Sequence, residues 1–538
     1  MALNKNVRVP LPENGIVPQK SGNAIYAYHT VRAYRNKKGN PTSERVSIGR
    51  IEEETGMLIP NRNYYEVYLR TEVPEVKCIK SYGLTYLVDN IMKELRLDDV
   101  LRQKFPGVSE QIIALAEYIL AEGNIMYYYD DWIDETYPYD NVKLKSQDIS
   151  RIFQVIDYKR RMDFFKTWIY AREQNEYIVY DVTSFSSYSQ EMESLEWGYN
   201  RDSDDLAQIN YAMYYGEQSL LPLYYCVYPG SINDKTHLGS MLRDNEVMGL
   251  KKARYILDRG FFSTENLQQL TSAGCRFIMA IPSSLIATTK LIDQYRNDIV
   301  NRSECRLGKG LPYAKSVIVE DFGIRCKAHI YYNQSKVAQE EEQLFEQIEK
   351  DEKALGSMET APPRSQKYDK YFYINTSKDG GFGFIRNQER IDAAMSRLGF
   401  FVILETDFRL TSEEVLTTYR RRDIIEKSFN QLKNGLDMKR LYCQSDATVE
   451  GKMFVAFISL ILRSFIQNRL KDYQLVTGLP FPAILKELRK LKFVCTKDGR
   501  KLLTPVTKKQ RDILNACGFS DEDIPSWLSK INAESCIV

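Results

Sequence analysis

Residues 176–281 constrain the fold most, because apolar strand-like runs alternate there with helix-like runs. EYIVYDVTSF is typical of a short apolar strand that ends at Asp181, and ARYILDRGFF is typical of a buried strand that ends at Asp258. Between them, two strands flank a turn at 216–217 and a helix follows. After Asp258 come another helix and the strand CRFIMAI. This order of strands and helices predicts a mixed α/β sheet.

Residues 411–433, TSEEVLTTYRRRDIIEKSFNQLK, predict one long helix. Thr411 and Glu414 have the spacing of a capping box at its start. Four polar side chains inside the helix fall within about 60° of one another, at roughly 100° per residue. They are Tyr419, Arg422, Glu426 and Lys433. One carboxylate, two cations and a phenol on one ridge can hold a metal-bound phosphate, and the solvated face of an amphipathic helix is the alternative interpretation.

Three carboxylates form a candidate metal site. Asp181 and Asp258 each follow an apolar run, and a carboxylate belongs at a strand end, where loops and solvent begin. Together with Glu426 they offer oxygen ligands to Mg²⁺, which suits a chain with three His. Two such ions can activate a water or a 3′-hydroxyl in phosphodiester chemistry. For either aspartate alone, capping a turn is the alternative role.

Composition narrows the class of protein. The chain has 538 residues, 43% of them hydrophobic, which allows more than one core. It has no run of about 18 apolar residues, no secretory signal and no C-x-x-C pair among nine Cys, so we expect a soluble intracellular protein with reduced thiols. The net charge is +2, but residues 486–511 hold ten Lys and Arg against two acids, and residues 417–440 hold seven against three. Such patches can neutralise phosphates, although a solvated helix face explains them as well.

The patterns divide the chain into five regions. Residues 1–75 predict a β unit with a hairpin around KKGNPT, and residues 76–172 a helical region that could bind DNA or dimerise. Residues 173–282 and 401–475 form the predicted core, which includes the nearly all-round apolar helix at 453–470. Residues 283–400 predict a β-rich insertion into that core. Residues 476–538 form a basic C-terminal region.

Four ordered motifs resemble those of one family. Asp181-Val182-Thr183 gives D-x-T after a hydrophobic strand, and Asp258-Arg259-Gly260 gives D-R-G. The segment LPLYYCVYPGSINDKTHL lies between these acids, and residues 419–433 match Y-x2-R-x3-E-x6-K without gaps. Together the motifs cover roughly residues 176–470. They resemble the DDE transposases of bacterial insertion sequences, in the insertion-sequence-4-like group with its Y-R-E-K signature.

The resemblance implies a ribonuclease-H-like mixed-sheet catalytic core, interrupted by the β-rich insertion and preceded by the N-terminal β hairpin and helical region. The implied catalytic and metal-binding residues are Asp181, Asp258 and Glu426. The implied cofactor is two Mg²⁺ ions, with Mn²⁺ as a substitute. The residues implied to contact DNA are Tyr419, Arg422 and Lys433.

The resemblance also implies an activity and partners. The activity is metal-dependent cleavage of DNA at the element's ends, followed by strand transfer. The partners are double-stranded DNA, both terminal inverted repeats and target, and a second copy of the chain in a homodimer. The implied location is the bacterial cytoplasm, at the nucleoid, with no membrane partner.

Two departures from the family pattern leave questions open. After the first acid, family members often carry a Lys-Asp-x-Arg-Pro-Asp-Leu-like run, whereas residues 201–206 read RDSDDL. Some relatives stack a Trp of the insertion on a flipped base, but no Trp lies between 259 and 425. Stacking there would fall to Tyr or Phe, for instance Tyr331, Tyr332, Tyr371 or Phe372.

Two other interpretations remain beside an active transposase. One is a catalytically inactive transposase-derived DNA-binding protein, and the other is a nuclease of the same fold, which cuts but does not join. The intact acids at 181, 258 and 426 favour the active transposase, because an inactive copy has no chemical reason to keep them.

Overall fold

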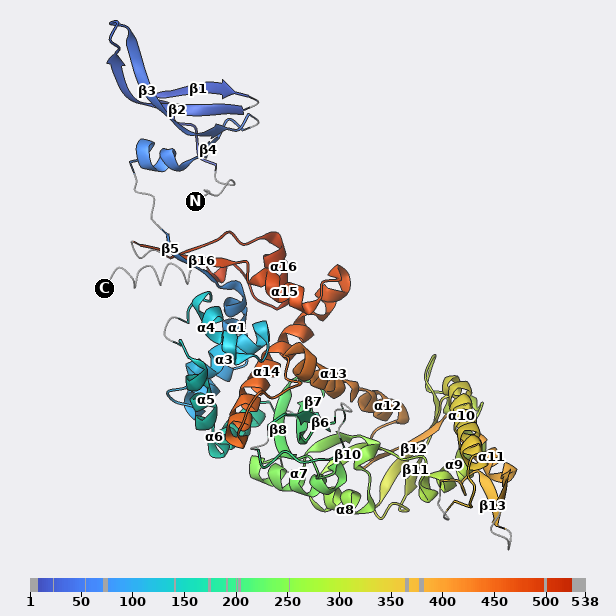
Figure 1. Cartoon of the computed structure of the whole chain (residues 1–538). Coiled ribbons are helices and arrows are strands. Elements are labelled where there is room, and N and C mark those ends of the chain that lie inside the picture. The colour runs from blue at the N-terminus through green and yellow to red at the C-terminus, as the bar shows by residue number, and fades with distance from the viewer. Residues whose placement is uncertain are drawn as a thin grey trace. The chain divides into compact units, whose positions relative to one another are not determined.

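The computed structural model describes most of the chain. The described residues are 8–22, 24–53, 55–70, 76–139, 142–172, 176–189, 192–199, 201, 205–250, 252–362, 367–376, 382–497 and 501–524. The chain divides into two compact units (Figure 1). The first comprises Met1–Tyr82, Lys490–Lys508 and Ser520–Val538, and the second comprises Gly83–Arg489 and Lys509–Phe519.

The first unit contains a four-stranded antiparallel sheet in the order β1-β2-β3-β4. The strands are Ile16–Ser21, Ala24–Arg35, Pro41–Ile51 and Leu58–Pro60. β2 and β3 flank the turn-rich residues 36–40 and pair up to Arg35 and Pro41. Ala27, Ile48 and Leu58 form a small core with Tyr64, which begins the π-helix η1 (Tyr64–Tyr68).

A second sheet of this unit joins segments that are far apart in the sequence. Its order is β17-β16-β5, with bounds Lys501–Leu503, Lys492–Thr496 and Val76–Ser81. β16 pairs antiparallel with both neighbours. Residues that the sequence patterns assign to the helical region and to the basic C-terminal region therefore share one sheet.

The second unit begins with a helical layer. Its helices are α1 (Gly83–Glu94), α2 (Leu97–Lys104), α3 (Ser109–Glu122), α4 (Tyr129–Asp134), α5 (Ser146–Val155) and α6 (Tyr158–Tyr170), with the short turn η2 (Met126–Tyr128). They pack on the 32-residue helix α14 (Asp446–Thr477), and the ring of Phe454 lies 4.9 Å from that of Phe105 and 5.0 Å from that of Phe164 (Figure 1). Nearly every residue of 449–466 is buried, which confirms the predicted core helix. No helix among the described residues is long and apolar enough to cross a bilayer.

An eight-stranded mixed sheet forms the centre of the second unit, in the order β11-β12-β15-β10-β9-β6-β7-β8. The strands are Tyr177–Ser186 (β6), Gln208–Gly216 (β7), Pro222–Pro229 (β8), Arg254–Leu257 (β9), Arg276–Ile281 (β10), Tyr313–Val319 (β11), Cys326–Tyr332 (β12) and Phe400–Glu405 (β15). β6, β9 and β10 run parallel to one another, and the other pairs are antiparallel. Helices α7 (Asp234–Met248) and α8 (Thr264–Ser272) connect β8 to β9 and β9 to β10 (Figure 1). The predicted mixed α/β sheet is confirmed.

Residues 283–400 differ in two ways from the expected β-rich insertion. β11 and β12 extend the main sheet beside β15, so part of the segment belongs to that sheet. The remainder is mostly helical, with α9 (Ile286–Ile299), α10 (Val337–Gly356), α11 (Gln388–Met395), the short turns η4 (Ser303–Cys305) and η5 (Gln334–Lys336), and the hairpin of β13 (Phe372–Thr376) and β14 (Phe382–Arg386). Ile348, Phe372 and Ile391 anchor a separate small core there.

Candidate active site

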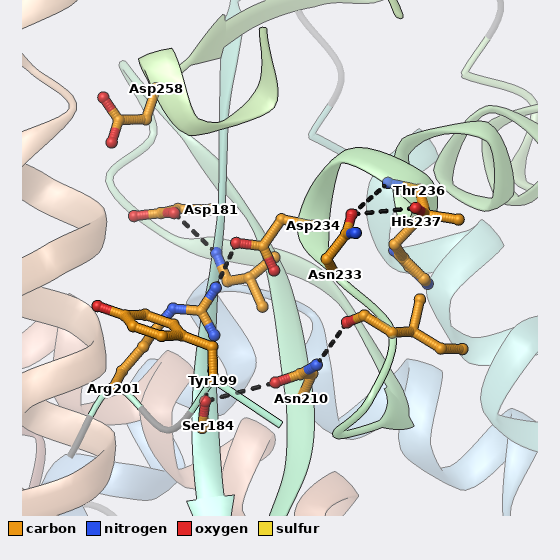
Figure 2. A network of polar contacts seen from close by, with 12 residues as sticks. Asp181, Ser184, Tyr199, Arg201, Asn210, Asn233, Asp234, Thr236, His237 and Asp258 are labelled. Atoms are coloured by element: carbon orange, nitrogen blue, oxygen red, sulfur yellow. Dashed lines mark hydrogen bonds and ion pairs between the residues drawn. The ribbon is translucent and has the colours of Figure 1, made fainter. Parts of the chain in front are cut away.

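Asp181 and Asp258 are brought together by the pairing of two parallel strands. β9 ends at Leu257, which lies opposite Tyr180 of β6. The next residue of each chain segment is one of the two aspartates, so the register sets them side by side, as Figure 2 shows. The predicted end of a strand at Asp181 is wrong, because β6 continues to Ser186 and stays paired with β7 over this length. Asp181 therefore lies where β9, one of the two strands beside β6, ends.

The carboxyl group of Asp181 is partly buried and lies close to a second acid. Its Oδ1 accepts a hydrogen bond of 2.8 Å from the backbone N–H of Val182. Burial raises the pKa of Asp181 to about 7, and Asp258 adds to this rise. The Val182 hydrogen bond and the positive charges of Arg422 and Arg201 act in the opposite direction. Two neighbouring carboxylates repel each other when both are ionised. A nearby cation therefore stabilises the ionised form of Asp181.

Asp258 connects the strand to the helix of the predicted ridge. Its Oδ1 accepts hydrogen bonds from the backbone N–H of Arg259 (2.7 Å) and from the hydroxyl of Tyr419 (3.3 Å). Its Oδ2 lies 3.3 Å from a guanidinium nitrogen of Arg422. Burial raises the pKa of Tyr419 and Asp258 raises it further, so the phenol stays a neutral donor. Tyr419 and Arg422 thus meet on one carboxylate.

The predicted long helix is interrupted in the middle of its triple arginine. The structure has α12 (Ser412–Arg420), α13 (Asp423–Asn430) and a π-helical turn η6 (Gln431–Gly435), while the capping box of Thr411 and Glu414 is present as predicted. The backbone N–H groups of Arg421, Arg422, Ile424 and Ile425 each bond to the carbonyl three residues back. Arg421 forms an ion pair with Glu217, whereas Arg422 forms one with Asp258. A stretch of such tighter turns inside a helix often marks a functional hinge or local strain.

Arg422 connects Glu426 to Asp258 by forming an ion pair with each of them. A guanidinium nitrogen of Arg422 lies 2.9 Å from Oε1 of Glu426, whose side chain is 51% exposed. Burial lowers the pKa of Arg422, but Tyr419 and the three acids outweigh it and raise this pKa, so the guanidinium stays charged. Within the described ranges, no three acidic, His or Cys side chains gather closely enough to hold a metal ion. Asp181 and Asp258 fit the ligand chemistry of a divalent ion, whereas Arg422 stands between them and Glu426.

Lys433 lies beside β6, further along this strand than Asp181. It belongs to η6, is buried, and its Nζ lies 5.5 Å from the ring centroid of Phe185. Phe185 is four residues after Asp181, and side chains at even spacing share one face of a strand. Lys433 is therefore near the face that carries Asp181, at about 13 Å for four residues of strand.

A cavity of about 720 Å³ opens beside Asp258, Tyr419 and Arg422. Its charged lining holds six cations, Arg259, Lys336, Lys370, Arg397, Arg420 and Arg422, and two acids, Asp258 and Glu340. Four of these eight residues come from the segment 283–400. This excess of positive charge suits a polyanion that passes the acids. Of the aromatic residues considered for stacking there, Tyr331, Tyr371 and Phe372 are buried, and Tyr332 is partly buried.

A second polar network borders Asp181 and was not predicted (Figure 2). Arg201 forms an ion pair with Asp234, and its guanidinium also donates to Oγ of Ser184 at 3.1 Å. The buried Asn210 donates to the carbonyl of Ile232 at 2.9 Å and lies 3.4 Å from Ser184 Oγ. The sequence signal was weak, because Ser184 and Asn210 look like ordinary strand residues. The rest of the unassigned run, 202–206, lies mostly outside the described residues, with only 205–206 described.

Residues 173–462, more than half of the chain, match the family described as Transposase DDE domain. The protein belongs to this family of DDE transposases. The family implies an enzyme with nuclease and transferase activity that acts on DNA and uses divalent metal ions. No curated protein matches the chain. A solved piggyBac transposase synaptic complex with hairpin DNA is similar over 79% of this chain and 76% of its own, at 8% identity and a TM-score of 0.35.

Proposed function

We propose that the protein is an active transposase of the insertion-sequence-4-like group, which cleaves DNA at the ends of its insertion sequence and transfers the freed strand. The observation that carries this proposal is the grouping of Asp181 and Asp258 at the end of β9, with Arg422 joining Asp258 to Glu426. These are the acids of the D-x-T, D-R-G and Y-R-E-K motifs. Their position on a mixed sheet supports a ribonuclease-H-like core.

The proposed metal ligands are Asp181, Asp258 and Glu426, which are to hold two Mg²⁺ ions, or Mn²⁺ in their place. Three carboxylates without imidazole or thiolate suit these hard cations. The raised pKa of Asp181 beside a second acid also supports a cation there. When bound, Mg²⁺ polarises a phosphate oxygen and lowers the pKa of an attacking water or hydroxyl.

The chain's own residues then bind and orient the DNA. Arg422 has five N–H donors in a planar fork, and once released from Asp258 and Glu426 these match a phosphate. Tyr419 is a neutral hydroxyl donor at the edge of the cavity and positions a phosphate or sugar. Lys433 contributes a point charge further along β6. The cationic cavity beside Asp258 supports DNA entry from that side.

The proposed reaction has two steps. Water first breaks a phosphodiester bond at the element's end and leaves a 3′-hydroxyl. That hydroxyl then attacks a phosphodiester of the other strand or of the target, so one bond forms as another breaks. Two element ends need two active sites, so we propose a homodimer on the paired ends.

The test is a cleavage and joining assay on labelled DNA that carries the element's own ends, with Mg²⁺ or Mn²⁺. Wild type is compared with Asp258→Asn and Glu426→Gln. Asp423→Asn is the matched control, because Asp423 lies on the same helix and forms a surface ion pair with Lys427. We expect metal-dependent cutting and joining in wild type and control, and neither in the two site variants.

Other results point to other functions. Cutting without joining identifies a nuclease of the same fold. Tight DNA binding without cutting in either metal identifies an inactive, transposase-derived DNA-binding protein. Activity retained by both site variants rules out the proposed acids.

A further inference from the structure

A cavity of about 710 Å³ lies beyond the end of β6, away from the acids. Its lining comes from residues 187–189, which directly follow β6, from residues 440–445, and from parts of α5 and α14. It shares no lining residue with the cavity beside Asp258. The two cavities are therefore separate features of the same unit.

β6 fixes how far this cavity is from the acids. Ser186, the last residue of β6, forms a parallel bridge with Arg440 at the edge of the cavity. The five residues from Asp181 to Ser186 span about 17 Å of strand. At the 3.4 Å rise per nucleotide of a duplex strand, this is about five nucleotides, and an extended single strand covers it with fewer.

Positive side chains follow β6 over this distance. Arg422 lies at Asp258, Lys433 lies over Phe185, and Arg440 lies beside Ser186. η6 and the residues after it connect the last two, since the N–H of Lys439 bonds to the carbonyl of Lys433. Lys433 is buried and adds positive potential from below, so Arg440 is the cation that a nucleic acid backbone at the cavity can contact.

Two exposed tyrosines line the cavity itself. Tyr188 is 72% exposed and Tyr442 is 64% exposed. The guanidinium of Arg440 lies 5.7 Å from the ring centroid of Tyr188. Large exposed rings beside a cation, in a polar hollow, are the features that bind unstacked bases and their phosphates.

The position of Tyr442 is held by its surroundings. Its φ is +48°, a left-handed conformation that is strained for a residue other than glycine. Leu441 and Cys443 on either side are buried, and the buried Lys452 donates a hydrogen bond of 2.8 Å to the carbonyl of Leu441. The Lys452 ammonium also lies 5.7 Å from the Tyr442 ring. These contacts hold an exposed ring in a strained backbone, which points to a function for that ring.

We propose that this cavity binds unpaired DNA bases a few nucleotides from the cut, with Tyr188 and Tyr442 as stacking surfaces and Arg440 as a phosphate ligand. The inference deepens the proposed function and rests on it for the identity of the ligand as DNA. Bases must leave the duplex to stack on a tyrosine face, so the site favours single-stranded over double-stranded DNA.

The experiment measures binding of the full chain to fluorescein-labelled (dT)20 and to a 20-base-pair duplex. Tyr188→Ala and Tyr442→Ala are expected to weaken (dT)20 binding about 5- to 150-fold each, the range found for loss of one base-stacking ring. Tyr188→Phe and Tyr442→Phe should bind like wild type. Arg440→Gln should lower the slope of log K against log[salt] by about 0.7. Tyr170→Ala is the matched control, because Tyr170 is 86% exposed and lies at the end of α6.

Three outcomes decide the inference. Alanine variants that bind (dT)20 like wild type overturn it, and so does an equal loss for duplex and single strand. A selective loss on (dT)20, rescued by Phe and absent in the control, supports it. Failure of the wild type to cleave element-end DNA counts against the proposed function instead, since the (dT)20 measurement needs no cleavage.

Discussion

Asp181 lies in β6 and Asp258 directly follows its neighbour β9, whereas Glu426 lies on the exposed side of an interrupted helix. The first two are set by strand register and are confined by β7, β9 and η3 (Arg259–Phe261). Glu426 is held by one ion pair to Arg422, next to the change in helix type. The sheet thus fixes the positions of Asp181 and Asp258, which form the strand half of the site. Glu426, the helix half, depends on one arginine, Arg422. Changes in the two halves should have different consequences for stability and for activity.

The largest effect is expected from Asp181→Asn. Loss of a proposed metal ligand should lower the cleavage rate by about 10³-fold or more, beyond the 10- to 100-fold typical of an outer-shell partner. Because ionising the buried Asp181 is costly, the same change should leave the melting temperature at pH 8 unchanged or higher. Cleavage kinetics and thermal melting of the same preparation check this. A variant that is both inactive and strongly destabilised would contradict a role restricted to the reaction.

Arg422→Lys tests the link between the two halves. Lysine keeps the charge but not the planar fork that reaches both Asp258 and Glu426, so cleavage should fall about 10- to 100-fold. Arg421→Lys is the control, because Arg421 pairs with Glu217 rather than with the proposed acids. Its cleavage rate should stay within about twofold of wild type. Equal losses in both variants would indicate a general effect on the helix.

The pH dependence of stability tests the strand half alone. The pKa of Asp181 is about 7 in the folded chain and near 4 in an unfolded one, so the folded state binds more protons between these values. Stability should therefore fall as pH rises from about 4 to 7, and this contribution should not fall further above that range. With EDTA present, the wild type should lose on the order of 1–3 °C more than Asp181→Asn between pH 5 and pH 8. Identical melting curves for both chains would refute the raised pKa.

Glu426→Gln should have the smallest effect on stability. Its side chain is half exposed and its ion pair is of the surface type, which contributes about 0–1 kcal/mol. We expect a melting temperature within about 1 °C of wild type, together with lost cleavage. A large drop in melting temperature would show that Glu426 supports the fold rather than the reaction.

Sequence patterns identified the parts of the fold that depend on local signals. Apolar runs marked the central strands, and the capping box of Thr411 and Glu414 marked the start of α12. They failed where a distant partner decides the structure. β6 runs past Asp181 because β7 pairs with it, and β11 and β12 join the main sheet because β15 returns beside them.

The candidate site could likewise be predicted from the sequence only in part. The ridge spacing correctly grouped Tyr419, Arg422 and Glu426, since an ion pair and a shared carboxylate connect them. Lys433 lies with Phe185 because the helix tightens at Arg421 and widens at Gln431. A helical wheel assumes an ideal α-helix throughout, so it predicts neither the tightening nor the widening. The Arg201–Asp234 pair needed the fold, because nothing in its spacing marks it.

The pairing of β16 with β5 has a consequence for synthesis on the ribosome. Ser81 pairs with Lys492, and 492 − 81 = 411 residues must be made between them. At roughly 5–20 residues per second this takes about 20–80 s, during which β5 has no partner from β16. An unpaired strand edge can pair with another chain, so this interval favours association between nascent copies. Slow translation beyond residue 81 should therefore lower the yield of folded protein more than slow translation beyond residue 496.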